Sequence, residues 1–171
     1  MKKDNVILIG MSGAGKSTLG VLISKAIGKN FFDTDILIQQ REGKLLQQII
    51  DLDGLNRFMR AEERAILSLN IHGCVIATGG SVVYSERAMK HLKKRGTVVY
   101  LKVDFNELEG RLSNIKNRGI VFKGANDLRS VYEERLPLYE KYADITVDCT
   151  GCGVEDSVEA ITQMLTVSKE K

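Results

Sequence analysis

Long apolar runs are absent from this sequence of 171 residues. The longest clean runs, such as residues 6–9, are far too short to span a bilayer, so no membrane-spanning helix is expected. The stretch MKKDNVILIG also lacks the apolar region and the cleavage site of a signal peptide. We therefore expect a cytoplasmic protein with no membrane partner.

Cysteine and histidine are scarce. Three cysteines, an odd number, argue against a disulfide framework, and His72 and His91 have no metal-ligand spacing. Cys149 and Cys152 have C-x-x-C spacing, but a redox or zinc site would need a thioredoxin-like unit or a second ligand pair. We interpret CTGC as a turn at the end of a strand and keep a metal or redox site as the alternative.

Strong charge of either sign is also missing. The net charge is +3 at pH 7, with 43% hydrophobic and 27% charged residues, which is typical of a globular domain. An anionic ligand accounts for this mild basicity, and no basic stripe or aromatic stacking pattern indicates a nucleic-acid partner. We expect one domain over residues 1–171 that works as a monomer on a small molecule.

Apolar β-rich runs alternate with helical patterns along the chain. The expected strands are residues 5–10, 30–33, 74–78, 97–103 and 145–149, and the expected helices are 16–27, 36–41, 45–70 with a break near Asp53-Gly54, 85–95, 104–113, 127–142 and 154–165. Such alternation predicts an α/β fold in which helices cover both faces of a parallel sheet. Pro137 should kink or break its helix.

One complete motif follows the first strand. Residues 10–17 read GMSGAGKS, which fits the phosphate-loop pattern G-x4-G-K-[ST] between a strand and a helix. Backbone N–H groups of residues 12–16 should face phosphate oxygens, Lys16 should reach the β and γ phosphates, and the Ser17 hydroxyl should bind Mg²⁺. We expect ATP to contact Ser12, Gly13, Ala14, Gly15, Lys16, Ser17 and Thr18.

A magnesium site also needs a carboxylate. Asp104 ends a run that resembles a Walker-B strand, but Asp104 and Glu107 also fit a helix capping box, which we favour. The segment FFDTD offers Asp33 for the metal and Asp35 for an acceptor hydroxyl, because both side chains point the same way in an extended segment. The alternative is that Asp35 only caps the next helix.

Several further motifs stand in a characteristic order. They are F-x-D-x-D at Phe31–Asp35, F-x-x-x-E at Phe58–Glu62, TGGS at Thr78–Ser81, Arg118 in a polar loop, and R-x-P-L-Y at Arg135–Tyr139. With the phosphate loop, their order and rough spacing resemble the shikimate kinases over nearly the whole chain. The resemblance implies a P-loop kinase fold of three α/β/α layers, with sheet order 2-3-1-4-5 and a mobile lid at about residues 114–126.

The resemblance also implies a reaction and residue roles. ATP would be the donor, Mg²⁺ would be required, and the 3-hydroxyl of shikimate would be the acceptor, as in the biosynthesis of aromatic amino acids. Carried over by position, the acceptor would be bound by Asp35, Gly79, Gly80 and Arg135, the metal assisted by Asp33, the ATP phosphates contacted by Arg118, and the adenine approached by Arg111. The alternatives are a solvated Arg118 and a surface Arg135 paired with Glu134 or Glu140.

Three positions depart from the family pattern. Met59 stands where an arginine would grip the shikimate carboxylate with help from Glu62, Ser81 replaces a third glycine, and Gly119 replaces a proline in the lid. Loss of one charged contact should cost about 1.5–3 kcal/mol. Arg60 points about 100° away from position 59 around the helix, so it could replace the missing arginine only by bending back. Lys123 in the lid is another candidate for that role.

These departures leave alternatives open. The leading hypothesis is a kinase that phosphorylates shikimate, with Lys16, Asp35 and Arg118 as catalytic residues. A kinase of the same fold for another hydroxylated acceptor is the first alternative, because Met59 and Ser81 both lie at the expected acceptor pocket. A nucleotide-binding regulator without catalysis is the second, although it would not need Asp35 or Arg135. A GTPase is not favoured, since the base-reading motif N-K-x-D is missing.

Overall fold

Five short strands of the computed structural model form one parallel sheet in the order β2-β3-β1-β4-β5. The structure describes residues 4–113 and 128–167. The strands are β1 (Asn5–Ile9), β2 (Asn30–Asp33), β3 (Cys74–Ala77), β4 (Gly96–Lys102) and β5 (Ile145–Asp148). The predicted sheet order is confirmed, and each predicted strand boundary is correct to within one residue.

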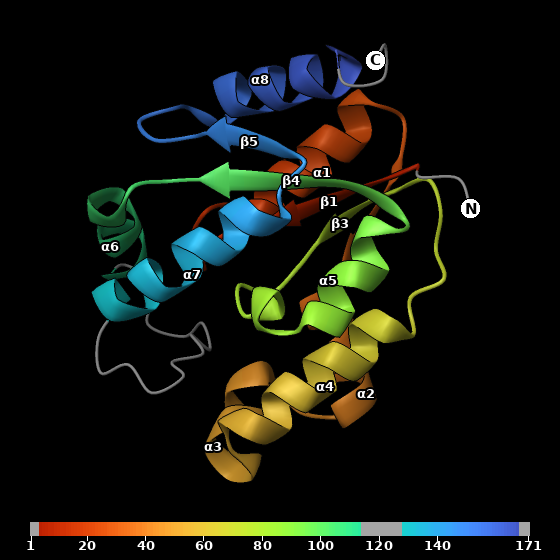
Figure 1. The fold of residues 1–171 in the computed structure, drawn as a ribbon, viewed down its shortest axis with the longest axis vertical. Helices are drawn as coiled ribbons and strands as arrows, with labels where there is room; N and C mark the ends of the chain where they lie inside the picture. Colours follow the sequence, from red (N-terminus) through yellow and green to blue (C-terminus); the bar gives the residue numbers. More distant parts are fainter. Residues whose placement is uncertain (1–3, 114–127, 168–171) are drawn as a thin grey trace.

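Helices cover both faces of this sheet. They are α1 (Lys16–Ala26), α2 (Thr34–Glu42), α3 (Leu46–Asp53), α4 (Leu55–Leu67), α5 (Glu86–Lys93), α6 (Phe105–Ser113), α7 (Leu128–Tyr142) and α8 (Val154–Val167), with a short 3-10 helix, η1 (Val82–Tyr84). Figure 1 shows α1 and α8 on one face and α5 and α7 on the other, which gives the three predicted layers. None of the helices in the described ranges is long and apolar enough to cross a membrane.

The core explains why the first strand reads as one apolar run. Strand β1 lies in the middle of the sheet between β3 and β4, and Ile7, Leu8 and Ile9 are fully buried. A strand that is covered on both faces has no solvent side, so it needs no polar alternation. The edge strand β5 does alternate, with Ile145 and Val147 buried and Thr146 and Asp148 exposed.

Helices α2, α3 and α4 form a smaller unit at one end of the molecule (Figure 1), and α2 follows the edge strand β2 directly. They share an apolar cluster of Ile38, Ile49, Phe58, Ala61 and Ala65. The predicted break near Gly54 is confirmed, because this residue separates α3 from α4 with a φ of 83°. Residues with a side chain rarely adopt this backbone conformation, so glycine suits the turn.

The expected effect of Pro137 is wrong in one respect, since α7 continues through this residue to Tyr142. Proline removes one helical hydrogen bond, the one that the carbonyl of Glu133 would accept. Both Glu133 and Pro137 are exposed, so water can satisfy that carbonyl. The cost of proline is therefore lower here than in a buried helix interior.

Candidate active site

The phosphate loop joins β1 to α1 in the predicted way. Gly10 has a φ of 144°, and a Cβ there would lie 2.7 Å from the carbonyl oxygen of Leu101. Gly15 precedes α1 in a left-handed conformation and provides no side-chain cap for the helix. No side chain therefore caps the start of α1, and the helix dipole favours negative charge there.

Lys16 and Ser17 begin α1 beside this loop. The Lys16 ammonium donates hydrogen bonds of 2.8 Å to the carbonyl oxygens of Gly10 and Met11, and only 8% of the residue is exposed. The Ser17 hydroxyl donates a 2.7 Å hydrogen bond to Oδ2 of Asp33. The sheet thus brings together the two oxygen groups that the sequence assigned to the metal. Ala14 is buried and Thr18 is exposed at the same loop and helix start.

The two aspartates of FFDTD take different conformations, which corrects the expectation that both lie in an extended segment. Asp33 ends β2 and caps α2 by accepting a 2.9 Å hydrogen bond from the backbone N–H of Asp35. Asp35 already belongs to the first helical turn. The alternative role of Asp35 as the cap is also wrong, because Asp33 performs it. Asp33 faces Ser17, whereas Asp35 lines a cavity.

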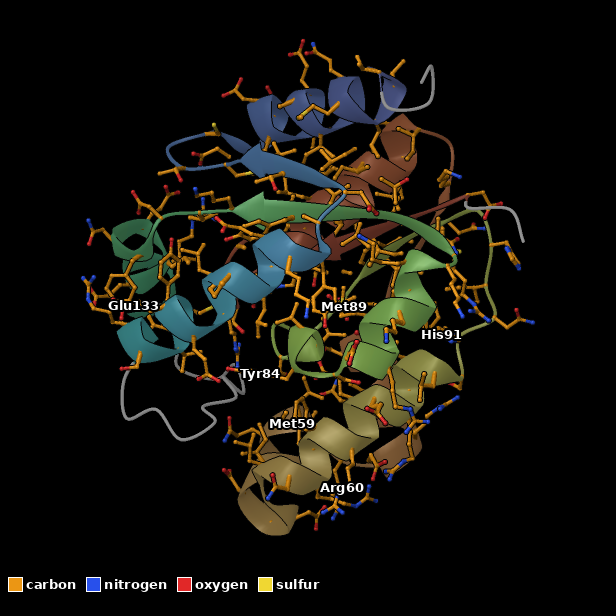
Figure 2. All side chains as sticks on the ribbon, in the orientation of Figure 1. Met59, Arg60, Tyr84, Met89, His91 and Glu133 are labelled. Atoms are coloured by element: carbon orange, nitrogen blue, oxygen red, sulfur yellow. The ribbon has the colours of Figure 1, made fainter. Side chains whose placement is uncertain are left out.

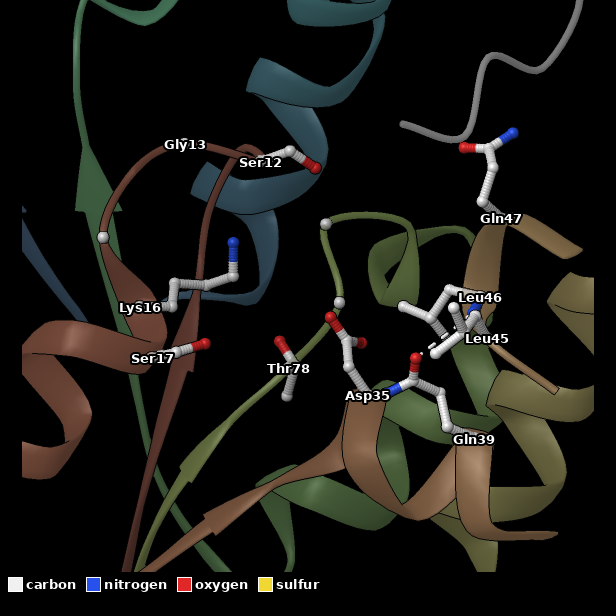
Figure 3. A pocket seen from close by; sticks show the side chains of 13 residues that line it. Ser12, Gly13, Lys16, Ser17, Asp35, Gln39, Leu45, Leu46, Gln47 and Thr78 are labelled. Atoms are coloured by element: carbon white, nitrogen blue, oxygen red, sulfur yellow. Dashed lines mark hydrogen bonds between the residues drawn. The ribbon is translucent and has the colours of Figure 1, made fainter. Parts of the chain in front are cut away.

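That cavity, of about 510 Å³, lies between the phosphate loop and α2. Figure 3 shows Lys16 and Ser17 reaching in from one side and Asp35 from the other. Its described lining is Ser12, Gly13, Gly15, Lys16, Ser17, Asp35, Gln39, Leu45, Leu46, Gln47, Thr78, Gly79 and Gly80. Gln39 and Leu45–Gln47 were not predicted to line the site, because their helical pattern carries no motif that distinguishes a pocket wall from an ordinary surface.

A smaller cleft of about 30 Å³ adjoins the cavity. The two hollows share Ser12, Asp35, Leu46, Gly79 and Gly80, and the cleft adds Phe58, Ser81 and Arg135. The predicted acceptor residues Asp35, Gly79, Gly80, Ser81 and Arg135 are therefore brought together. The larger hollow contacts the phosphate loop, so groups suited to a donor and to an acceptor face one continuous site.

Arg135 comes from α7 and is fully buried. Its Nε donates a 3.2 Å hydrogen bond to the hydroxyl of Tyr84, and its Cζ lies 5.1 Å from the centre of that ring. The alternative of a surface arginine is therefore wrong. Tyr139, one helical turn further, donates a 2.6 Å hydrogen bond to the carbonyl of Gly80. The R-x-P-L-Y motif thus positions both the Arg135 cation and the turn at Gly79–Gly80, called the glycine turn below.

Gly79 approaches two carboxylates so closely that a larger residue does not fit. A Cβ at Gly79 would lie 2.3 Å from Oε1 of Glu62 and 3.2 Å from Oδ1 of Asp35. Glu62 is 3% exposed, and its other oxygen, Oε2, accepts a 2.7 Å hydrogen bond from Ser81. Burial raises the pKa of Glu62 to about 7. This pKa shift has no signal in the sequence, because it depends on how α4 packs against the turn at Gly79–Ser81.

Gly79→Ala should therefore destabilise the protein. The added methyl group must displace the buried Glu62 carboxyl, and we expect the free energy of unfolding to fall by about 1–3 kcal/mol in urea titrations. Gly110→Ala is the matched control, because a Cβ there meets nothing within 4 Å on helix α6. That control should leave stability unchanged or raise it. Equal stability of the two variants would contradict the close contact at Gly79.

Arg111 connects α6 to the phosphate loop. Its Nη1 donates a 3.1 Å hydrogen bond to the carbonyl of Gly13, and its Nη2 pairs with Glu107. Asp104 caps α6 by accepting a 2.8 Å hydrogen bond from the N–H of Glu107, so the predicted cap is confirmed. The predicted capping box is wrong, because Thr150 takes the N–H of Asp104 and the Glu107 carboxylate bonds to Gly151.

The CTGC segment forms the predicted turn after β5. The backbone N–H of Cys152 bonds to the carbonyl of Cys149 at 3.3 Å, and Gly151 has a φ of 68°. Cys149 is buried and Cys152 exposed, both as free thiols. Within residues 4–113 and 128–167, no three side chains of the metal-ligating kinds cluster to hold an ion.

Met59 is half-buried on α4 and packs against the apolar cluster of α2, α3 and α4. Figure 2 shows Met59 on the side of α4 nearer Tyr84 and Arg60 on the other side. Arg60 is exposed and donates a 3.2 Å hydrogen bond to the carbonyl of Asn56, and Arg57 pairs with Glu42 at 2.7 Å. Neither arginine takes the place of a cation at position 59. The predicted lid residues Arg118, Gly119 and Lys123 lie outside the described residues.

Comparison with known proteins assigns the family. The family model described as shikimate kinase matches residues 12–166. A shikimate kinase of Thiobacillus denitrificans is 38% identical over 167 residues, 96% of this chain and 89% of that protein. One from Actinobacillus succinogenes is 41% identical over 151 residues, 85% of this chain and 86% of that protein.

A solved structure agrees with these sequence matches. Shikimate kinase from Acinetobacter baumannii in complex with shikimate has a TM-score of 0.90 and 28% sequence identity, and the match covers 99% of this chain and 97% of that one. The predicted fold, and the prediction of a phosphotransferase with an alcohol acceptor, are confirmed. This chain belongs to the shikimate kinase family.

Proposed function

We propose that this protein transfers the γ-phosphoryl group of ATP to the 3-hydroxyl of shikimate. The observation that carries the proposal is the shared site: Lys16 of the phosphate loop and Asp35 line one cavity, and Arg135 lines the cleft that adjoins it. Phosphoryl transfer depends mainly on holding two reactants in line and neutralising charge. A site with a cationic donor side and a carboxylate on its acceptor side meets both needs.

On the donor side, the loop N–H groups and Lys16 would hold the ATP phosphates. The Ser17 hydroxyl and the Asp33 carboxylate are oxygen ligands of the kind that Mg²⁺ prefers, and their 2.7 Å contact puts them together at the loop. They therefore fit a magnesium ion, which when bound would neutralise charge on the β and γ phosphates. Arg111, which already contacts Gly13, would lie at the nucleotide, and Arg118 is proposed as a further phosphate contact.

On the acceptor side, Asp35 would accept a hydrogen bond from the reacting hydroxyl. As the acceptor oxygen bonds to the γ-phosphorus and the bond to the bridging oxygen of ADP breaks, the hydroxyl proton passes to the Asp35 carboxylate. The buried Arg135 would pair with the shikimate carboxylate, and Gly79 and Gly80 would allow the ligand close to the backbone. These roles match those that the family resemblance implies.

A coupled ADP-release assay tests the proposal. ATP, Mg²⁺ and shikimate should give steady turnover, whereas hydroxylated acids of other shapes should give far less. No turnover with shikimate at millimolar concentration, together with turnover of another acid, would favour the alternative that Met59 marks a changed acceptor. Tight ATP binding without any turnover would favour a regulator.

Met59→Arg should lower the KM for shikimate. An arginine on the side of α4 near Tyr84 would add a second cation for the carboxylate, and one charged hydrogen bond is worth about 1.5–3 kcal/mol, or tenfold or more in affinity. Met59→Leu is the control, because it keeps the apolar packing and adds no charge. An unchanged or higher KM in Met59→Arg would mean that position 59 does not face the carboxylate.

A further inference from the structure

Glu62 and Ser81 form a buried polar pair behind the glycine turn. Both residues are 3% exposed, and Ser81 Oγ donates a 2.7 Å hydrogen bond to Oε2 of Glu62. The second oxygen, Oε1, has no hydrogen-bond partner among the described residues. A buried carboxyl with so little compensation lowers stability, and polar groups kept at such a cost are concentrated at functional sites.

The pair contacts the backbone that faces the acceptor. Oε1 of Glu62 lies 2.3 Å from the position of a Cβ at Gly79, so the carboxyl packs directly against this residue. Gly79, Gly80 and Ser81 line the small cleft together with Asp35 and Arg135. A shift of the Glu62 carboxyl would therefore move the turn on which the acceptor rests. The Ser81 hydroxyl is the group that fixes that carboxyl in place.

Among the described residues, the charged groups that act most strongly on Glu62 belong to the site. They are Asp35 on α2, Arg135 on α7 and Lys16 at the phosphate loop. Ionised Glu62 adds a negative charge close to Arg135, and this weakens the attraction of the site for an anionic acceptor. By linkage, a bound carboxylate would in turn oppose the ionisation of Glu62.

We propose that Ser81 and Glu62 are a positioning pair that sets the affinity of the Gly79–Gly80 turn for shikimate. This inference rests on the proposed function and adds to it two residues that need not touch the reacting atoms. Ser81 fixes the geometry of the turn through Glu62, and the charge on Glu62 sets how strongly Arg135 attracts the acceptor carboxylate.

Ser81→Ala tests the first part. We expect the KM for shikimate to rise about five- to tenfold, the value of one hydrogen bond, while kcat and the KM for ATP stay within about twofold. Ser85→Ala is a matched control. Ser85 donates a 2.6 Å hydrogen bond to Glu63, which follows Glu62 on α4, and also caps α5. Its loss should lower the melting temperature and leave the KM for shikimate unchanged.

Glu62→Gln tests the second part without relying on Ser81→Ala to fold. Glutamine keeps an oxygen acceptor for Ser81 and carries no charge. The pKa of Glu62 is raised by burial to about 7, so in the wild type the carboxyl gains its charge as the pH rises through this value. We expect the wild-type KM for shikimate to rise between about pH 6 and about pH 8. In Glu62→Gln it should stay near the low-pH value.

The outcomes separate the inference from the function. Wild-type protein without shikimate turnover would overturn both. An active wild type in which Ser81→Ala leaves the KM for shikimate unchanged, or changes it no more than Ser85→Ala does, would overturn the inference alone. The same holds if Glu62→Gln keeps the wild-type pH dependence of KM.

Discussion

Lys16→Ala is expected to reduce kcat at least about a hundred- to a thousandfold, the usual cost of removing one fixed group that stabilises charge in a transition state. The Lys16 ammonium lies over the phosphate loop, 2.8 Å from two of its carbonyl oxygens, and is largely screened from water. A charge held there needs little reorganisation when negative charge moves toward the departing ADP.

Lys25→Ala is the control for this prediction. Lys25 is exposed in the last turn of the same helix, away from the phosphate loop, so its removal should leave kcat unchanged. Rates from the coupled assay, with melting curves for both variants, separate a catalytic loss from unfolding. A folded Lys16→Ala protein that keeps more than about a tenth of the wild-type kcat would contradict the assignment.

Asp35→Asn should reduce kcat by about a hundred- to ten-thousandfold, because the amide retains the shape of the side chain and cannot take a proton. Asp35 lines both the cavity and the adjoining cleft, so the effect should appear at the acceptor step and not in nucleotide binding. We expect the affinity for ATP, measured by calorimetry, to stay close to that of the wild type.

Asp53→Asn is the matched control for the acceptor carboxylate. Asp53 pairs with Lys44 at 2.6 Å on the surface of the small helical unit, so its loss should change neither kcat nor KM. Asp35→Asn protein with an unchanged kcat would show that the acceptor hydroxyl needs no base here. A loss of ATP affinity equal to the loss of rate would place Asp35 on the donor side instead.

The strands and the phosphate loop were predictable because their signals are local, whereas the order of the strands in the sheet came from the family resemblance. A buried central strand is apolar along its length, and the glycines of GMSGAGKS determine the conformation of the loop that they form. The split of Asp33 and Asp35 between a cap and a helical turn was not predictable. It depends on the residue at which α2 begins, and boundaries of this kind are weakly encoded in sequence.

Other features depend on contacts between distant segments. The sequence indicates that Arg135 lies on a helix, but its complete burial results from Tyr84 and the glycine turn packing against α7. The lining by Gln39 and Leu45–Gln47 follows from the way α2 and α3 pack across the cavity from the phosphate loop. Pattern analysis cannot weigh such contacts, and for the same reason the expected break at Pro137 is absent.

Met59 and Ser81 both lie near one buried carboxyl. Met59 precedes Glu62 by three residues on α4, and Ser81 bonds to Glu62 from the turn after β3. Positions three apart are neighbours on a helix surface, so a cation at position 59 would lie near that carboxylate. In this chain a neutral hydroxyl bonds to Glu62, and Arg135 is the cation that the described residues contribute to the cleft.

Identification of the reaction product is the decisive test of phosphoryl transfer to shikimate. Purified protein with ATP, Mg²⁺ and shikimate should form one shikimate 3-phosphate for each ADP released, followed by phosphorus NMR and mass spectrometry. The Lys16→Ala and Asp35→Asn variants should form almost none. Release of ADP with inorganic phosphate as the only other product, or phosphorylation of a different hydroxylated acid in preference to shikimate, would contradict the account.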